Sequence, residues 1–86
     1  MKILIPHLNY TVTVKKPRKD MDSFAEVQPD GFDGCTLYIK RPVKDKALLA
    51  HELTHVLQFL CEERDIEMHK ELEHMGYLME WLMKKI

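Results

Sequence analysis

Residues 51 to 55 read His-Glu-Leu-Thr-His, an HExxH pattern that can bind a metal ion and use it in hydrolysis. On an α-helix, residues four apart are separated by one turn, about 6 Å along the axis and about 40° around it. His51 and His55 therefore point the same way. Their imidazoles can bind one Zn²⁺ at about 2.0 to 2.1 Å, with room for a third protein ligand and a water. Glu52 lies about 60° around the helix from His55, where its carboxylate can act as general base on a water.

The alternative interpretation of this pattern is a polar helix face with two solvated histidines, because HExxH also occurs by chance in unrelated proteins. The rest of the helix favours a metal site. Its apolar residues recur at helical spacing on one face: Leu49, Leu53, Val56 and Leu60. The face that carries His51 and His55 lies roughly opposite, so the histidines are not simply core residues.

Two helices are predicted to carry this site and its surroundings. No Gly or Pro occurs between Pro42 and Gly76, and the stretch is rich in strong helix formers. The spacing predicts one helix from Val43 to Glu62 and a second that begins near Asp65, as N-cap, and continues to the C-terminus. The second helix has an apolar stripe of Met68, Leu72, Met75, Met79, Leu82 and Ile86. Because residues 61 to 65 contain no helix breaker, a single kinked helix is an open alternative.

The first 40 residues alternate like β-strands. TVTV at 11 to 14 and TLYI at 36 to 39 are the strongest candidates, and KILI at 2 to 5 and FAEV at 24 to 27 are weaker ones. The pattern predicts one domain, residues 1 to 86, of the α+β class, in which a small N-terminal sheet precedes the two helices. The strand within TLYIKRP ends a few residues before the HELTH helix. It is either a structural strand or one that offers an open edge to an extended substrate.

Composition excludes several classes of function. The formal net charge is −1 and there is no long basic run, so we predict no nucleic-acid binding. The nearest approach to a basic patch, Lys15, Lys16, Arg18 and Lys19, is interpreted as a solvated turn. The opening MKILIP is too short for a signal sequence or a membrane span, which predicts a cytoplasmic protein without membrane contact. Cys35 and Cys61 lack metal-ligand spacing and are expected to be reduced and buried.

The segment LLAHELTHVLQFL at 48 to 60 resembles the active-site helix of zincin metallopeptidases of the gluzincin type. The segment ELEHMGYLMEWL at 71 to 82 is similar to the glutamate helix of very small phage-encoded proteins assigned as metallopeptidases. The resemblance covers about residues 35 to 86, and HELTH is its one sharp motif. It implies a minimal zincin-like fold, a Zn²⁺ cofactor, His51 and His55 as ligands with a glutamate from the second helix, Glu52 as catalytic base, and a peptide or protein substrate. For a phage-encoded chain it implies the host cytoplasm.

The position of each residue on the second helix and the resemblance favour different third ligands. At about 100° per residue, Glu71 falls inside the apolar stripe of the second helix, where a carboxylate is costly unless it is paired or bound to a metal. Glu73 lies on the opposite side with Tyr77. The resemblance favours Glu73, because its spacing to Gly76 and Tyr77 matches that of the phage proteins and Gly76 would let the two helices approach closely. We predict Glu73, with Glu71 next and His74 third.

The predicted function is zinc-dependent peptide-bond hydrolysis. The chain lacks a thermolysin-type NExxSD segment and a third histidine at metzincin spacing, so the substrate range is undefined. One alternative is a catalytically weak or inactive zincin-fold protein that acts as a metal-binding regulatory or protein-interaction module. Another is a module whose Met-rich second helix docks a partner, and a homo-oligomer through this helix is also open. Methionines at 68, 75 and 79 are more often core residues.

Overall fold

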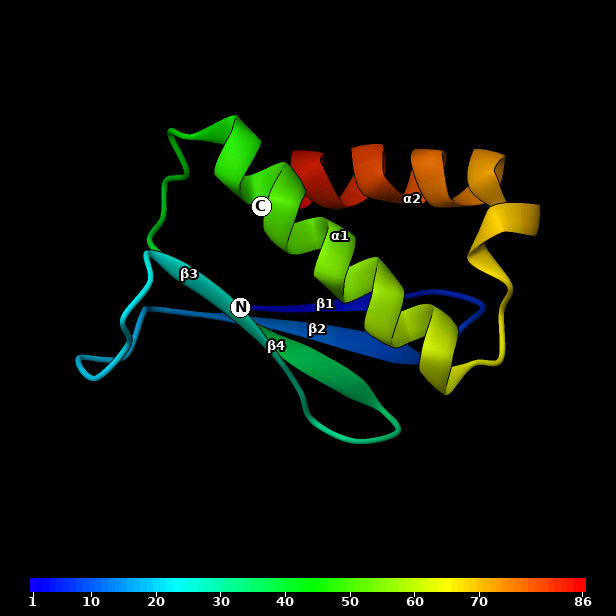
Figure 1. Cartoon of the computed structure of the whole chain (residues 1–86), viewed down its shortest axis with the longest axis horizontal. Helices are drawn as coiled ribbons and strands as arrows, with labels where there is room; N and C mark the ends of the chain where they lie inside the picture. The colour runs from blue at the N-terminus through cyan, green and yellow to red at the C-terminus, as the bar shows by residue number, and fades with distance from the viewer.

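Four strands form one mixed sheet, and two helices cover one of its faces, in a computed structural model that describes residues 1 to 86 (Figure 1). The strands are β1 (Lys2–Ile5), β2 (Tyr10–Lys15), β3 (Ala25–Pro29) and β4 (Gly34–Ile39). The helical elements are α1 (Lys46–Glu63), the short 3₁₀ helix η1 (Met68–Lys70) and α2 (Leu72–Lys85). The predicted α+β class is confirmed. Neither helix combines the length and the apolar character that a membrane-spanning helix requires.

The order of the strands across the sheet is β1-β2-β4-β3. β1 pairs with β2 and β3 with β4 in antiparallel fashion, while β2 and β4 are parallel. β4, which contains TLYI, therefore has a partner on both sides. Of the two interpretations left open for this strand, the structural one is confirmed and the open edge is wrong, because β3 pairs with its second side. The free edges of the sheet belong to β1 and β3.

Alternation along the strands separates a core face from an open face. The strand residues whose side chains belong to the buried core are Ile3, Ile5, Tyr10, Val12, Val14, Ala25, Cys35, Leu37 and Ile39. One glycine is required for the parallel pairing. A Cβ on Gly34 would lie 2.0 Å from the carbonyl oxygen of Thr11 on β2, so a side chain at this position would push the two strands apart.

Helix α1 has well-defined ends that differ from the predicted ones. It begins at Lys46 because the side chain of Asp45 accepts a hydrogen bond from the backbone nitrogen of Leu48 at 3.0 Å. It ends after Glu63, where Asp65 has a φ of +53° and the chain turns away. Asp65 is thus a left-handed residue after α1, and its prediction as the N-cap of the second helix is wrong. This break also excludes a single kinked helix.

Helix α2 begins at Leu72 and buries less of its surface than predicted. Met75 and Leu82 are buried against the core. Leu72, which was predicted to belong to the apolar stripe, is 65% exposed. Gly76 is also exposed, and a Cβ at this position would meet nothing within 4 Å. The expectation that Gly76 lets the two helices approach closely is therefore wrong.

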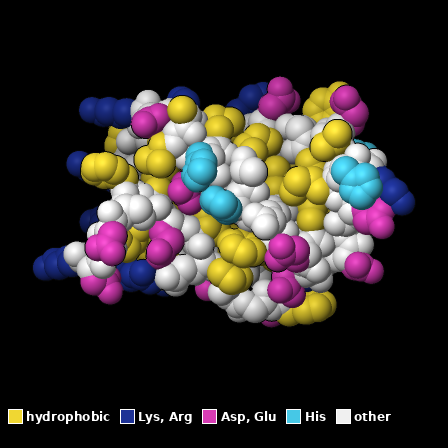
Figure 2. All heavy atoms as spheres, viewed as in Figure 1, with side chains coloured by type: hydrophobic (Ala, Val, Ile, Leu, Met, Phe, Trp, Pro, Cys, Tyr) yellow, Lys and Arg dark blue, Asp and Glu magenta, His cyan; other side chains and the backbone are white.

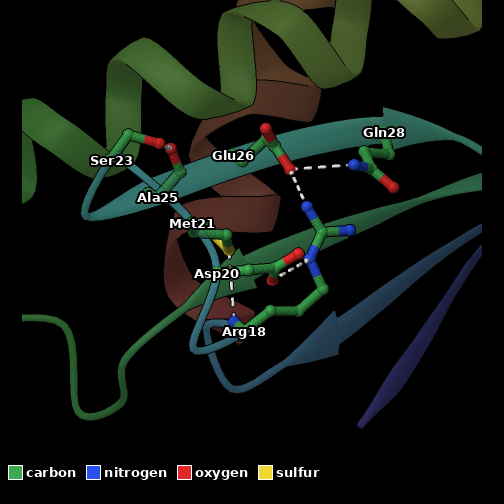
Figure 3. A network of polar contacts seen from close by, with 7 residues as sticks. All are labelled: Arg18, Asp20, Met21, Ser23, Ala25, Glu26 and Gln28. Carbon is green, nitrogen blue, oxygen red and sulfur yellow. Dashed lines mark hydrogen bonds and ion pairs between the residues drawn. The ribbon is translucent and has the colours of Figure 1, made fainter.

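The basic residues after β2 are exposed, as predicted, and one of them, Arg18, also binds the sheet (Figure 3). The Arg18 guanidinium lies 2.9 Å from the Glu26 carboxylate on β3 and 3.4 Å from that of Asp20. It also lies 4.8 Å from the centre of the Tyr38 ring on β4. Gln28 donates a hydrogen bond to the same Glu26 oxygen at 2.9 Å. These contacts hold the connection between β2 and β3 against the open face of the sheet.

Arg64, which follows α1, joins three parts of the fold. Its guanidinium donates hydrogen bonds to the carbonyl oxygens of Leu8 at 2.8 Å, Asn9 at 3.0 Å and Phe32 at 2.7 Å. These carbonyls belong to the turn after β1 and the turn before β4. Because bonds to a charged donor contribute more than neutral ones, Arg64→Ala is expected to lower the free energy of unfolding by about 2 to 4 kcal/mol. Chemical denaturation measures this change.

Two further variants test the origin of that effect. Arg64→Lys is expected to recover little of the stability, because one ammonium group cannot reproduce the spacing of three guanidinium bonds. Arg41→Ala serves as the control for loss of an exposed arginine, and its effect is expected to stay within about 0.5 kcal/mol. An Arg64→Ala protein as stable as the Arg41→Ala protein would contradict the account.

Candidate functional site

The HELTH motif lies in the middle of α1, on the side turned away from the sheet. The apolar stripe of this helix is completely buried and fixes its rotation: Leu49, Leu53, Val56 and Leu60. His51 is exposed and His55 is half-buried, and their ring centroids are 5.0 Å apart with the rings inclined at 78°. Figure 2, drawn from the same direction as Figure 1, shows the two histidine side chains side by side over α1. The predicted common direction of the two imidazoles is confirmed.

Glu52 lies between this histidine face and the core. Its residue is only 7% exposed, and it is the one buried carboxylate of the chain. The Glu52 side chain takes part in no hydrogen bond or ion pair of the protein. Tyr10 Oη is the one fully buried side-chain oxygen or nitrogen without a partner, so the Glu52 oxygens must be in contact with solvent. A carboxylate in this position is costly unless water, a proton or a cation satisfies it.

The helix that carries the motif packs near one edge of the sheet. α1 packs on β3 and β4, and β3 is the edge strand of that pair. β3 carries half-buried Glu26, Val27 and Gln28 and ends at Pro29, a composition typical of edge strands. The sequence left an open edge on β4 as one of two alternatives. Pro29 was the signal that could have assigned the edge to β3.

The predicted third ligands on α2 are not brought to the histidine pair. Glu73 is exposed and lines a small hollow on the outer face of α2 with Gly76, Tyr77 and Glu80. Because Met75 and Leu82 turn the inner face of α2 toward the core, Glu73, two residues before Met75, points away from it. The prediction that Glu73 lies opposite the buried stripe is confirmed.

The two alternative ligands, Glu71 and His74, pair with each other. Glu71 precedes α2, and its carboxylate lies 2.7 Å from Nδ1 of His74. Nowhere in the chain do three or more His, Cys, Asp or Glu side chains gather in a way that could hold a metal ion. The structure therefore brings together His51 and His55 alone, and the identity of a third ligand stays a prediction.

The cysteines do not add a metal ligand. Cys35 and Cys61 are both free and buried, as predicted. Burial raises the pKa of the Cys35 thiol to about 11, and burial likewise raises the pKa of Cys61, with the charge of Glu62 adding to the effect. Burial therefore disfavours both thiolates, and neither cysteine belongs to a group of side chains that could hold a metal ion.

Searches against models of protein families, curated proteins and solved structures find no match to this chain.

Proposed function

We propose that this protein is a zinc-dependent metallopeptidase with a minimal zincin-like fold. The observation that carries the proposal is Glu52, a buried residue whose carboxylate has no protein partner, on the same helix as two imidazoles whose ring centroids are 5.0 Å apart. A helix that served only as a structural element would have little reason to keep such a carboxylate in this position.

The residues present fit Zn²⁺ in part. His51 and His55 would hold the ion, because their rings lie one helical turn apart on the outer face of α1. The third protein ligand of our proposal, Glu73, would reach them only if α2 turned its outer face toward α1. When bound, Zn²⁺ supplies Lewis-acid polarisation of a carbonyl group and makes water more acidic.

Glu52 would move the proton in peptide hydrolysis. Its carboxylate accepts a proton from the attacking water while the water oxygen bonds to the carbonyl carbon. Glu52 then gives that proton to the amine as the carbon–nitrogen bond breaks, and one new carboxyl group and one new amine result. The position of Glu52, close to the core but open to solvent, suits this exchange because part of its hydration is already removed.

The edge of β3 is the part of the sheet that could align a substrate beside α1. An extended peptide can add to a free strand edge through backbone hydrogen bonds. β3 has such an edge, and α1 packs directly on this strand. A peptide bound there would lie beside α1.

A second candidate function is a metal-binding regulatory or interaction protein without turnover. The observation that favours it is the separation of Glu71, Glu73 and His74 from the histidine pair, which leaves only two assembled ligands. The Met-rich face of α2 gives less support to a docking role. Met75 is buried and packs against Cys61 at 3.6 Å between the sulfurs, so this part of the face belongs to the core.

The two functions are distinguished by cleavage of a peptide mixture. Purified protein would be stripped with a chelator, divided, and reloaded with Zn²⁺ or with Mg²⁺, and the new N-termini in the mixture would be identified by mass spectrometry. A peptidase is expected to cleave only after zinc is restored. Stoichiometric zinc binding without any cleavage would favour the regulatory protein and contradict the proposed activity.

Two alanine variants of α2 test the third ligand. Under our proposal, Glu73→Ala lowers the affinity for Zn²⁺ by more than about tenfold, while Glu71→Ala changes it little, because only Glu73 would bind the metal. Competition with a chromophoric chelator measures both affinities. If only the Glu71→Ala protein loses zinc, the ligand is Glu71. Glu73 then stays on the outer face of α2 when the metal binds.

A further inference from the structure

β1 has a free edge whose backbone groups are available for pairing. The Met1 nitrogen donates to the Val14 carbonyl at 3.1 Å, and the Val14 nitrogen donates to the Met1 carbonyl at 2.7 Å. Antiparallel pairs alternate between hydrogen-bonded and non-bonded positions, so the next bonded residue of β1 is Ile3, opposite Val12. The N–H and C=O groups of Lys2 and Leu4 therefore point outward, away from β2. The edge is short but unpaired.

A groove adjoins this edge on the helix side of the sheet. It has a volume of about 820 Å³ and lies between Ile5 and the turn after β1 on one side and α2 on the other. The part of α2 that lines it runs from Glu71 to Trp81, about 15 Å along the helix axis. An extended chain of four or five residues has the same length, at about 3.3 Å per residue.

The lining of the groove is largely apolar, with its carboxylates at one end. Its apolar residues include Ile5, Leu8, Ile66, Leu78 and Trp81. The three carboxylates, from Asp65, Glu67 and Glu71, belong to the segment between α1 and α2, as does the single ammonium group of Lys70. Glu67 pairs with Lys70 at 2.6 Å and Glu71 with Nδ1 of His74 at 2.7 Å, and with the histidines neutral the net charge is −2. This end of the groove therefore favours a cationic group.

We infer that the β1 edge and this groove bind an extended, basic segment of another protein as an added strand. The backbone of the segment pairs with the outward groups of Lys2 and Leu4. Every second side chain then points to the helix side and enters the groove near Leu78 and Trp81, which requires apolar residues at alternate positions. A basic residue at one end of the segment meets the carboxylates of Asp65, Glu67 and Glu71.

This surface is separate from the candidate metal centre. β1 and β3 are opposite edges of the same sheet, and α1 with its histidine pair packs on β3 and β4. Binding at β1 is therefore expected to be independent of His51 and His55. Zinc content should not alter it.

The probe is the peptide acetyl-Lys-Val-Ser-Ile-Ser-Val-Lys-amide, which alternates apolar residues and has a lysine at each end. Trp81 is the single tryptophan of the chain and lines the groove, so its fluorescence reports binding without a label. Saturable binding with a change in this fluorescence is expected, together with shifts of the Lys2 and Leu4 amide resonances. The same peptide with glutamate at both ends is expected to bind about tenfold more weakly.

Two methylated peptides test the backbone pairing. One carries N-methyl groups on both serines and the other on the isoleucine, and alternate N–H groups of a strand point to opposite edges. One of the two peptides is therefore expected to bind about tenfold more weakly than the parent, and the other about equally.

Leu4→Pro removes an outward N–H from the protein itself. Proline is tolerated on an edge strand where its nitrogen faces solvent, and Leu4 is 56% exposed, so the fold is expected to persist while binding is lost. Leu4→Thr keeps the N–H and is the matched control. If the proline variant fails to fold, the methylated peptides carry the test on the unchanged protein.

Several outcomes overturn the inference. They are absence of binding, equal binding of both methylated peptides, undiminished binding by a folded Leu4→Pro protein, and equal affinity for the glutamate-ended peptide. Equal binding of the methylated peptides would mean that the groove holds an apolar ligand without strand pairing. A chain that sediments as a dimer and becomes monomeric with Leu4→Pro would show that a second copy occupies the edge instead.

Discussion

Replacement of His51 by alanine is expected to lower the affinity of the protein for Zn²⁺ by more than about 100-fold. Loss of a residue that only hydrogen-bonds to a metal ligand typically costs 10- to 100-fold, and loss of a ligand itself should cost more. Since His51 is exposed, its removal leaves the buried stripe of α1 intact. Zinc affinity would be measured by competition with a chromophoric chelator, and folding by circular dichroism.

The matched control for this experiment is His69→Ala. His69 is an exposed histidine in η1, outside the pair on α1. Its replacement removes one imidazole without touching the proposed site, so zinc affinity is expected to stay within about threefold of the parent value. If His51→Ala retained one equivalent of zinc at the parent affinity, the metal would be bound elsewhere on the chain.

Glu52→Gln is expected to lower the rate of peptide hydrolysis by about 10² to 10⁴-fold while zinc binding is unchanged. A general base contributes roughly this factor, and an amide oxygen is too weakly basic to accept the proton of water. Glutamine has nearly the same shape as glutamate, and Glu52 has no protein partner to lose, so the fold should persist. The rate would be measured on the fastest-cleaved peptide of the mixture.

Glu62→Gln provides the comparison on the same helix. Glu62 is exposed, and its only hydrogen bond is a long one, 3.5 Å, from Gln58. Its replacement is expected to leave both zinc affinity and hydrolysis unchanged. Full activity in the Glu52→Gln protein would remove Glu52 from the mechanism, and loss of zinc in that protein would make Glu52 a ligand.

The motif helix was predictable from sequence because its signals are local. The spacing of Leu49, Leu53, Val56 and Leu60 determines which face of α1 is buried, and this face alone places His51 and His55 outside. The four strands were also predicted, since β-branched and aromatic residues are frequent in β2 and β4 and isoleucines alternate along β1. Such patterns depend on residues a few positions apart.

The order of the strands and the rotation of α2 were not predictable in the same way. β4 enters the middle of the sheet between β2 and β3, which depends on the close approach of Gly34 to Thr11 across 23 positions of sequence. The break between the helices was predicted close to its place, but Asp65 was assigned as the N-cap of the second helix because a residue other than glycine seldom adopts the left-handed conformation. Because α2 begins at Leu72 and not near Asp65, the predicted apolar stripe does not describe its first turn. Leu72, a member of that stripe, is exposed.

The central claim is that His51 and His55 hold a zinc ion beside Glu52. Its most direct test is anomalous diffraction at the zinc absorption edge from crystals of the zinc-loaded protein. The account predicts one anomalous peak per chain at about 2.0 to 2.1 Å from a ring nitrogen of each of the two histidines. A peak at the Glu71 and His74 pair, or none at the histidines of α1 in crystals that contain stoichiometric zinc, would contradict it.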